Sequence, residues 1–210
     1  MAVSNIEEFK KFFEEQRGKR KFKQSVELAL NFKGIDFTKQ DNRINLEIVL
    51  PHNKGKVKKV AIIADDPSLI SKAKAAGVDV IDGSTISSIA SDPARMNKLI
   101  EYDLIAQPSL MPTIAKSLGQ FLGPRNKMPK PLIGVNLETL VSDLRRKINI
   151  KSKGRYLPTV HCVVGSEDMP PEEVYENIKT VIDAVTKKVG QGRLRSAYVK
   201  FSMSGALKIA

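Results

Sequence analysis

Strand-like segments of this 210-residue chain follow two hydrophobic patterns, and the change from one to the other is the strongest constraint on its fold. Near the N-terminus, Val26, Leu28 and Leu30 alternate with less apolar neighbours. This period of two is typical of a strand with one buried face and one polar face. In contrast, residues 60–64 are continuously apolar, as expected for a strand that is covered on both sides. We therefore expect two different kinds of sheet in one chain.

The middle of the chain, from residue 60 to residue 153, alternates apolar strands with helical segments. The expected elements are, in order, a strand at 60–64, a helix at 67–76, a strand at 78–81, a helical region at 86–100 interrupted at Pro93, a strand at 102–106, a helix at 110–118 and a helix marked by apolar residues from Leu137 to Ile148. Strands that alternate with helices form right-handed β-α-β units around a parallel sheet. The middle is therefore predicted to be a Rossmann-like, three-layer α/β domain.

Both ends of the chain show the alternating pattern and differ from the middle. The expected elements are a helix opening with the capping-box spacing of Ser4 and Glu7, strands near 25–31, 44–50 and 158–164, a long helix from Pro170, and closing strands near 194–201 and 206–209. Because the end segments resemble each other, we predict one discontinuous α+β domain with a mainly antiparallel sheet, formed by residues 1–59 and 154–210. The domain of residues 60–153 is inserted into it, and the fold class is α/β.

The charge balance favours a polyanionic partner. The chain has 35 Lys and Arg against 23 Asp and Glu, a formal net charge of +12 and an isoelectric point near 9.7. Basic residues occupy five of the seven positions 17–23 and four of the six positions 54–59. One such cluster is more often a solvated surface, but two in a chain of this charge favour contacts with nucleic acid phosphates. Membrane attachment has less support, because no basic amphipathic helix with an aromatic face and no lipidation motif accompanies the clusters.

Other features of the composition suggest a soluble protein of a reducing, cytoplasmic compartment. A single cysteine, Cys162, excludes an internal disulfide. No apolar run approaches the roughly 18 residues of a membrane span, and the first residues lack the apolar stretch of a signal peptide. Two histidines and one cysteine are too few for a zinc site built from those residues, so no metal and no cofactor is predicted.

The sequence offers little support for catalysis. The first strand of the middle domain runs into Asp65 and Asp66, where a nucleotide-binding fold would need glycines, and no Gly-x-Gly-x-x-Gly or Walker motif occurs. The two carboxylates could hold Mg²⁺, but a role in capping the next helix is favoured. His52 and His161 have no catalytic partner near them in sequence. We predict that the protein is not an enzyme, with a Mg²⁺-dependent α/β enzyme as the alternative.

Two other segments have both a functional and a structural interpretation. Residues 123–129 combine turn-forming residues, two cations and a methionine, which suits either a stiff connector or a basic fingertip on the second domain. Residues 196–205 place small hydroxyl residues around Met203 at the end of a strand. The hydroxyls could bond a ribose 2′-OH while the methionine packs on a sugar or base, although the pattern alone favours an ordinary β-turn.

These residues, taken in order, resemble the ribosomal protein L-one family, whose members bind RNA in the lateral stalk of the large ribosomal subunit. The resemblance covers nearly the whole chain and rests on Lys21-Phe22, Gly34-Ile-Asp36, Leu50-Pro-His52 with Gly55-Lys56, Leu122-Gly-Pro-Arg125 through Met128-Pro129, Pro170-Pro171, Ser196-x-Tyr-Val199 and Ser202-Met203. The Leu-Gly-Pro-Arg loop with its Met-Pro is the most specific of these motifs. The short N-terminus and the overall spacing are more similar to archaeal than to bacterial members.

The resemblance implies that the discontinuous domain binds 23S-type rRNA through a polar strand face and a late turn. Carried over by position, the expected RNA-binding residues are Lys21, Lys23, Glu27, Asn31, Phe32, Ser196, Ser202, Met203, Ser204 and Gly205, with secondary contacts from Arg125 and Lys127 in the second domain. The family's usual Thr-Met-Gly turn is Ser202-Met203-Ser204 here, so a hydroxyl is kept at position 202. Ser204 adds a Cβ where backbone would approach RNA closely, and Gly205 is expected to take over this role.

The resemblance also implies that the protein is a monomer when free and becomes a structural constituent of the large subunit. Family members assist the release of deacylated tRNA from the exit site and repress translation of their own mRNA by binding a structure similar to the rRNA site. We therefore expect exit-site tRNA and the chain's own mRNA as further partners, no membrane, and a cytoplasmic, ribosome-associated location. Besides the Mg²⁺-dependent enzyme, a nonspecific RNA-binding or chaperone-like protein is an alternative that competition with unrelated RNA would distinguish.

Overall fold

In the computed structural model, which describes residues 6–55, 59–125, 127–133, 136–152, 157–190 and 192–210, the chain leaves one unit and returns to it later. The first unit comprises Met1–Val57 and Arg146–Ala210, and the second comprises Lys58–Arg145. Some positions named in the sequence analysis lie outside the described residues. These are the expected cap residue Ser4, residues 56–58 of the second basic cluster, Asn126 of the 123–129 loop and the expected domain boundary at residues 153–154. None of the described helices combines the length and the apolar character that a membrane crossing requires.

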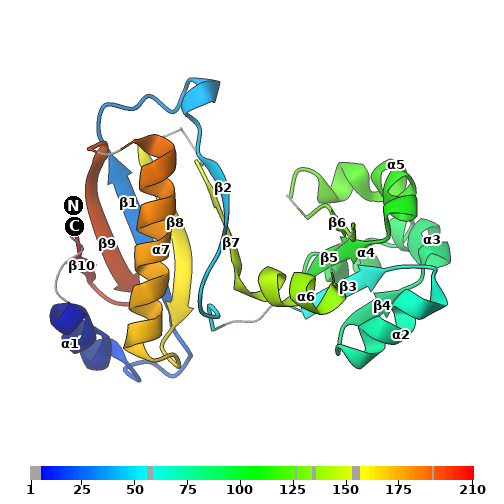
Figure 1. The fold of residues 1–210 in the computed structure, drawn as a ribbon, viewed down its shortest axis with the longest axis horizontal. Coiled ribbons are helices and arrows are strands. Elements are labelled where there is room, and N and C mark those ends of the chain that lie inside the picture. The colour runs from blue at the N-terminus through cyan, green and yellow to red at the C-terminus, as the bar shows by residue number, and fades with distance from the viewer. Residues whose placement is uncertain (1–5, 56–58, 126, 134–135, 153–156, 191) are drawn as a thin grey trace. The chain divides into compact units, whose positions relative to one another are not determined.

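An antiparallel four-stranded sheet forms the centre of the first unit (Figure 1). Its order is β10-β9-β1-β8, with bounds Ala206–Lys208, Leu194–Phe201, Ser25–Phe32 and Thr159–Ser166. Strand β1 comes from the N-terminal segment and pairs on both sides with strands from the C-terminal segment. The sheet therefore needs both end segments of the chain, and the antiparallel arrangement predicted for them is confirmed.

Helix α7 (Pro171–Val189) lies across one face of this sheet, and α1 (Ile6–Gln16) packs beside α7 (Figure 1). Prolines and acidic residues at the start of α7 and lysines in its last turn suit the direction of the helix dipole. Its buried stripe consists of Val174, Tyr175, Asn177, Ile178, Val181, Ile182 and Val185. The Phe13 ring of α1 meets Phe201 of β9 edge-on, with ring centroids 5.1 Å apart, so both helices share one core with the sheet.

A second, two-stranded sheet in the first unit pairs β2 (Asn45–Val49) with β7 (Lys147–Lys151). Strand β7 was not predicted: the expected helix extended to Ile148, whereas α6 ends at Arg146 and Ile148 is buried in the strand. Ile148 fits the apolar spacing of the helix, but it also alternates with Ile150 as in a strand. Pairing with β2 decides in favour of the strand. This pairing puts residues 147–151 in the first unit, whereas the sequence boundary assigned them to the second.

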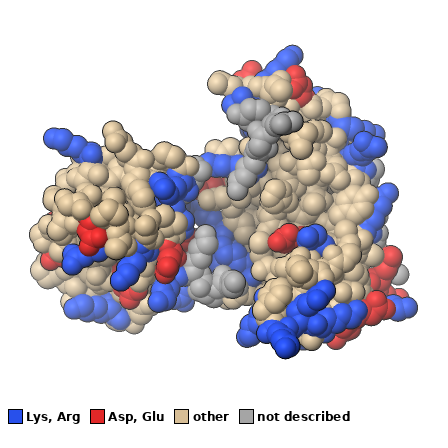
Figure 2. All heavy atoms as spheres, turned by 180° about the vertical axis from the view of Figure 1, so that it is seen from behind, with Lys and Arg blue, Asp and Glu red and all other residues tan. Residues whose placement is uncertain are grey.

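The other face of the four-stranded sheet, which we call the open face, is not covered by the described helices. In β1, Val26, Leu28, Leu30 and Phe32 are buried in the core shared with α7, whereas the residues that alternate with them are half-buried. Helix α7 lies in front of the sheet in Figure 1, and Figure 2 gives the view from behind. There the first unit presents a largely uncharged area, and charged side chains of both signs lie around it.

The second unit is built on a parallel sheet of order β4-β3-β5-β6, with bounds Asp79–Ile81, Lys59–Ile63, Tyr102–Ala106 and Lys130–Pro131. Its helices are α2 (Pro67–Ala75), α3 (Ile86–Ala90), α4 (Pro93–Leu99), α5 (Met111–Leu122) and α6 (Leu137–Arg146). Ala61 and Ile63 of β3 join one apolar cluster with α3, α4 and α5, and Val60 and Ile62 join another with α2 and α6. Helices therefore cover both faces of the sheet, which confirms the predicted three-layer α/β architecture.

Two helical segments of the second unit follow from local chemistry. The region expected at 86–100 is divided before Pro93, where the Asp92 carboxylate accepts hydrogen bonds from the first backbone N–H groups of α4. Helix α5 continues through Gly119 to Leu122, beyond the expected end at residue 118. The reason is that Ile114, Leu118 and Leu122 are buried at successive turns, and this packing outweighs the weak helix preference of glycine.

Candidate nucleic-acid interface

Cross-strand pairing places three of the predicted RNA-binding residues on the open face. Asn31 of β1 lies opposite Ser196 of β9, and Glu27 lies four residues earlier on β1, opposite Lys200. Positions four apart on a strand point to the same side, because successive side chains alternate. Glu27, Asn31 and Ser196 therefore belong to one surface, on which carboxylate, amide and hydroxyl groups offer both hydrogen-bond acceptors and donors.

A short hydrogen-bonded row crosses the open face at its Asn31 end. The Thr159 hydroxyl donates to Asn31 Oδ1 over 2.9 Å, and Asn31 Nδ2 donates to the Ser196 hydroxyl oxygen over 3.1 Å. These bonds fix the orientation of the amide and of the Ser196 side chain. Within the described part of the chain, the Ser196 O–H and the second Asn31 N–H are still available to donate to a ligand.

The turn at residues 202–204 is held in shape by its own hydroxyl groups. The Ser202 N–H donates to the Ser25 carbonyl over 3.1 Å, and the Ser25 N–H donates to the Ser202 hydroxyl oxygen over 3.2 Å. The Ser204 hydroxyl oxygen accepts from the Phe201 N–H over 2.9 Å. Both serines thus position the turn, whereas the sequence suggested that their hydroxyls contact RNA directly.

Met203 occupies the tip of this turn. Its N–H donates to Oε1 of the buried Gln24 over 3.1 Å, while its side chain is 58% exposed. A Cβ built on Gly205, two residues further along, would meet nothing within 4 Å, so the surface at Gly205 is open. An exposed thioether on a fixed turn can pack on a sugar or base that approaches this surface.

The first basic cluster, residues 17–23, directly precedes Gln24, whose side chain bonds to the 202–204 turn. Lys19, Arg20, Lys21 and Lys23 are all exposed. The Lys23 ammonium lies 2.8 Å from the Asp168 carboxylate, and the hydrogen bond from Lys23 to Asp168 raises the pKa of Lys23 above its usual value. Lys23 is therefore charged at neutral pH but shares its charge with Asp168. The three residues at 19–21 are the stronger candidates for phosphate contacts.

Phe22 is a functional candidate that the sequence analysis missed. Its side chain is 51% exposed, whereas the other seven phenylalanines are buried or half-buried. An exposed aromatic ring among cations suits stacking on a nucleobase. The signal was present in the sequence, because Phe22 lies outside the alternating pattern of β1 and between two lysines.

Phe32, which was expected to contact RNA, lies in the core instead. Its side chain is 4% exposed, and its ring meets Phe37 edge-on with centroids 5.8 Å apart. The alternation of β1 accounts for this, because Phe32 shares the covered face with Leu30 and Leu28. Phe32 therefore presents little of its ring to a ligand, and it stays in the candidate interface only as a lining residue at the end of β1.

The two candidate cations of the second unit differ in availability. Arg125 is exposed, and its guanidinium carbon lies 4.1 Å from the centroid of the Phe121 ring. Lys127 is half-buried, and its ammonium donates to Asp103 Oδ1 over 2.9 Å and to the Tyr102 carbonyl over 3.0 Å. Because this ion pair uses the charge of Lys127 inside the unit, only Arg125 is kept as a candidate for secondary RNA contacts.

Asp65 and Asp66 both have structural partners. Asp65 Oδ1 accepts from the Gly83 N–H over 2.9 Å, and a Cβ at Gly83 would lie only 2.3 Å from this oxygen, so the carboxylate fills the gap between β3 and the residues after β4. The Asp66 carboxylate caps α2 by accepting from the Ser68 N–H over 2.9 Å. Among the described residues, no group of three or more His, Cys, Asp or Glu side chains is arranged to hold a metal ion.

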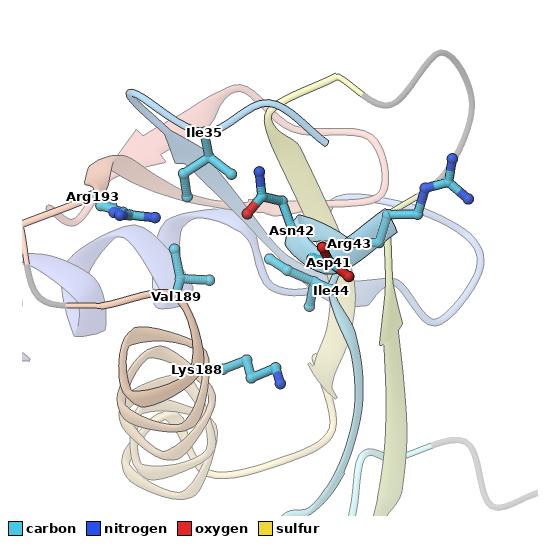
Figure 3. Close-up of a pocket in the computed structure, with 8 residues that line it drawn as sticks. All are labelled: Ile35, Asp41, Asn42, Arg43, Ile44, Lys188, Val189 and Arg193. Carbon is cyan, nitrogen blue, oxygen red and sulfur yellow. The ribbon is translucent and has the colours of Figure 1, made fainter. Parts of the chain in front are cut away.

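A small hollow lies near the C-terminal end of α7 (Figure 3). Lys188 and Arg193 flank it on one side, and Asp41 and Asn42 lie on the other. Arg43 points away from it and donates to two backbone carbonyls. With about 60 Å³ and lining charges of both signs, the hollow suits ordered water better than a ligand.

Comparisons with known proteins agree with the family resemblance seen in the sequence. Residues 10–205 match the model of the ribosomal protein L1p/L10e family. The chain is 44% identical over 196 residues to the large ribosomal subunit protein uL1 of Pyrococcus abyssi, covering 90% of this chain and 88% of the relative. It is 38% identical over 214 residues to the protein of the same name from Thermoplasma acidophilum, covering 100% and 97%. These relatives are archaeal, as the spacing of the chain suggested.

Proposed function

Because this chain belongs to the ribosomal protein L1p/L10e family, we propose that it is a structural constituent of the large ribosomal subunit that binds 23S-type rRNA at the lateral stalk. Binding to ribosomal RNA is general to this family, whose members are structural proteins of the ribosome and not enzymes. The protein is accordingly a cytoplasmic, ribosome-associated one, and a monomer before assembly.

One observation carries the proposal for the site: the fixed polar groups of the open face, the exposed Met203 on the turn after β9 and the basic segment before β1 all belong to the same unit. Cations at 19–21 position the RNA through its phosphates, which gives affinity without sequence information. Glu27, Asn31 and Ser196 bond to sugar and base edges, and Met203 packs on the sugar–base surface. Because these groups are fixed by the sheet and the turn, they select a folded RNA of matching shape.

We further propose the two finer roles that the family resemblance implies. The stalk protein assists the release of deacylated tRNA from the exit site, and it represses translation of its own mRNA. The second role needs only that an mRNA segment present the same shape to the open face as the rRNA does. The two RNAs would then exclude each other from the protein.

Crosslinking in a cell extract, followed by sequencing of the bound RNA, tests the main proposal. The expected result is one dominant region of the large-subunit rRNA, with a second peak in the leader of the protein's own mRNA if it is regulated in this way. An even distribution over unrelated transcripts would contradict shape-specific binding and support a nonspecific RNA-binding protein.

Met203→Ala is expected to weaken binding to stalk rRNA about tenfold without changing the melting temperature by more than a few degrees. The side chain is exposed, so its removal costs packing with RNA and little inside the protein. Filter binding at fixed salt measures the affinity.

Ser202→Ala serves as the matched comparison on the same turn. Its hydroxyl holds Ser25, so this variant should lose both affinity and some stability, on the order of 1 kcal/mol. Equal affinity of Met203→Ala and the unchanged protein would remove Met203 from the interface.

Replacing residues 58–145 by a short Gly-Ser linker should leave the affinity for stalk rRNA within about fivefold. Removal is feasible because Val49 pairs with Lys147 and the Leu50 N–H donates to the Arg146 carbonyl, so the chain re-enters the first unit beside the strand after which it leaves. Titration of the shortened and full-length proteins at the same salt concentration provides the comparison. Near-complete loss of binding by a folded shortened protein would assign a major part of the affinity to the second unit.

A further inference from the structure

A second hollow lies at the Asn31 end of the open face and is larger than the one near α7. It measures about 270 Å³, close to the lower end of the range for ligand pockets, roughly 300 Å³. Its lining residues are Asn31, Phe32, Pro158, Thr159, Arg195, Ser196 and Tyr198. Not one of them is acidic, and Arg195 is exposed without an ionic partner among the described residues. The hollow is therefore electrostatically suited to a group that carries a phosphate.

The lining also contains fixed donors for a polar ligand. The row from Thr159 through Asn31 to Ser196 is held by hydrogen bonds of 2.9 and 3.1 Å, which orient its groups before any ligand arrives. The Ser196 O–H and one Asn31 N–H have no acceptor among the described residues. A ribose hydroxyl or the edge of a base can satisfy them.

Tyr198 adds an aromatic ring to the rim of this hollow. Its neighbours Ala197 and Val199 are buried, whereas Tyr198 is half-buried, so its side chain belongs to the open face. Tyr198 of β9 lies opposite Ala29 of β1, whose small side chain covers little of the ring. Tyr198 is therefore placed as a platform on which one planar group can stack.

We propose that this hollow receives a single unstacked nucleotide of the bound RNA, with the base on the Tyr198 ring, the phosphate near Arg195 and the sugar or base edge at Asn31 and Ser196. This inference rests on the proposed function, because the RNA must first be placed on the open face. It adds that the recognised RNA carries an unpaired nucleotide turned out of its stack. It also makes Tyr198 a specificity-determining residue, in addition to those expected from the sequence.

Tyr198→Leu and Tyr198→Phe test this proposal with a transcript of the lateral stalk of archaeal large-subunit rRNA. Stacking of one base on an aromatic ring strengthens binding by roughly five- to a hundredfold. We expect Tyr198→Leu to bind the transcript about tenfold more weakly and Tyr198→Phe to bind it within about twofold, because phenylalanine keeps the ring. Melting temperatures of both variants verify that the substitution at this half-buried position has not unfolded the sheet.

A fluorescent base distinguishes stacking from a general loss of affinity. The adenine analogue 2-aminopurine is placed at each unpaired purine position of the stalk transcript in turn, at saturating protein. One position is expected to change its fluorescence on binding with the unchanged protein and with Tyr198→Phe, and to lose this change with Tyr198→Leu.

Two results would overturn the inference in different ways. If the unchanged protein prefers the stalk transcript over a scrambled one but Tyr198→Leu shows the same affinity and the same fluorescence pattern, the nucleotide site is wrong and the proposed function stands. If the unchanged protein does not distinguish the two transcripts, the proposed function and the nucleotide site both fail.

Discussion

Replacing Lys19, Arg20 and Lys21 together by glutamine is expected to weaken binding to stalk rRNA about a hundredfold at 0.1 M salt. All three side chains are exposed and have no ionic partner among the described residues, so their charges are free to meet phosphates. Losing each contact costs about 1 kcal/mol, or roughly a hundredfold for three together. The slope of log affinity against log salt should also become shallower by about 2, since fewer counterions are released.

A matched variant separates local contacts from net charge. Lys72, Lys74 and Lys98 are exposed on helices of the second unit, and replacing them by glutamine removes the same three charges. This variant should keep its affinity within about threefold. Equal losses for the two triple variants would show that overall charge, rather than the segment before β1, attracts the RNA. Lys23→Gln alone should have a small effect, because Lys23 is already paired with Asp168.

Asn177→Ala should destabilise the first unit by about 3 kcal/mol, the largest loss of stability that we expect from a single polar substitution. The side chain is fully buried in α7. Its Nδ2 donates to the Val164 carbonyl over 2.9 Å and to the His52 carbonyl over 3.4 Å, and its Oδ1 accepts from the His52 N–H over 3.1 Å. Alanine would remove the partner of these three backbone groups, of which the Val164 carbonyl bond is buried and the two His52 bonds are partly buried, at about 1 kcal/mol for each.

Unfolding in urea, followed by hydrogen exchange in peptides from β1 and α7, measures this loss in the first unit alone. Thr180→Ala is the control on the same helix, because among the described residues the Thr180 hydroxyl bonds only to the Glu176 carbonyl within α7. About 0.5 kcal/mol is expected. If Asn177→Ala costs less than about 1 kcal/mol, the segment after β2 is not held to α7 in the way described.

The sequence predicted the two kinds of sheet because hydrophobic period is a local property. Val26, Leu28 and Leu30 mark a half-covered strand, and residues 60–64 mark a strand covered on both sides, whatever lies around them. Strand β7 could not be predicted in this way. Ile148 satisfies the spacing of a helix and of a strand, and only its pairing with Ile48 of β2, 100 residues earlier, makes it a strand.

The candidate interface was predictable where strand alternation decides which way a side chain points. Glu27 and Asn31 follow from the pattern of β1, and the same pattern should have placed Phe32 in the core. The roles of Ser202, Ser204 and Lys127 depend on partners that are distant in sequence or supplied by backbone, namely Ser25, Phe201 and Asp103. Short sequence motifs carry no information about such partners, so the structural roles of these hydroxyls and of this cation could not be predicted.

The position of β1 between β8 and β9 determines when the open face can form during synthesis. The Ser25–Ser202 bond joins residues 177 positions apart, whereas every residue of the second unit has been made by Arg145. The inserted unit can therefore fold on the nascent chain while β1 still waits for its neighbours. A chain that stops before β9 lacks Ser196 and the 202–204 turn. Incomplete translation products would then be unable to compete with longer ones for places on new ribosomes.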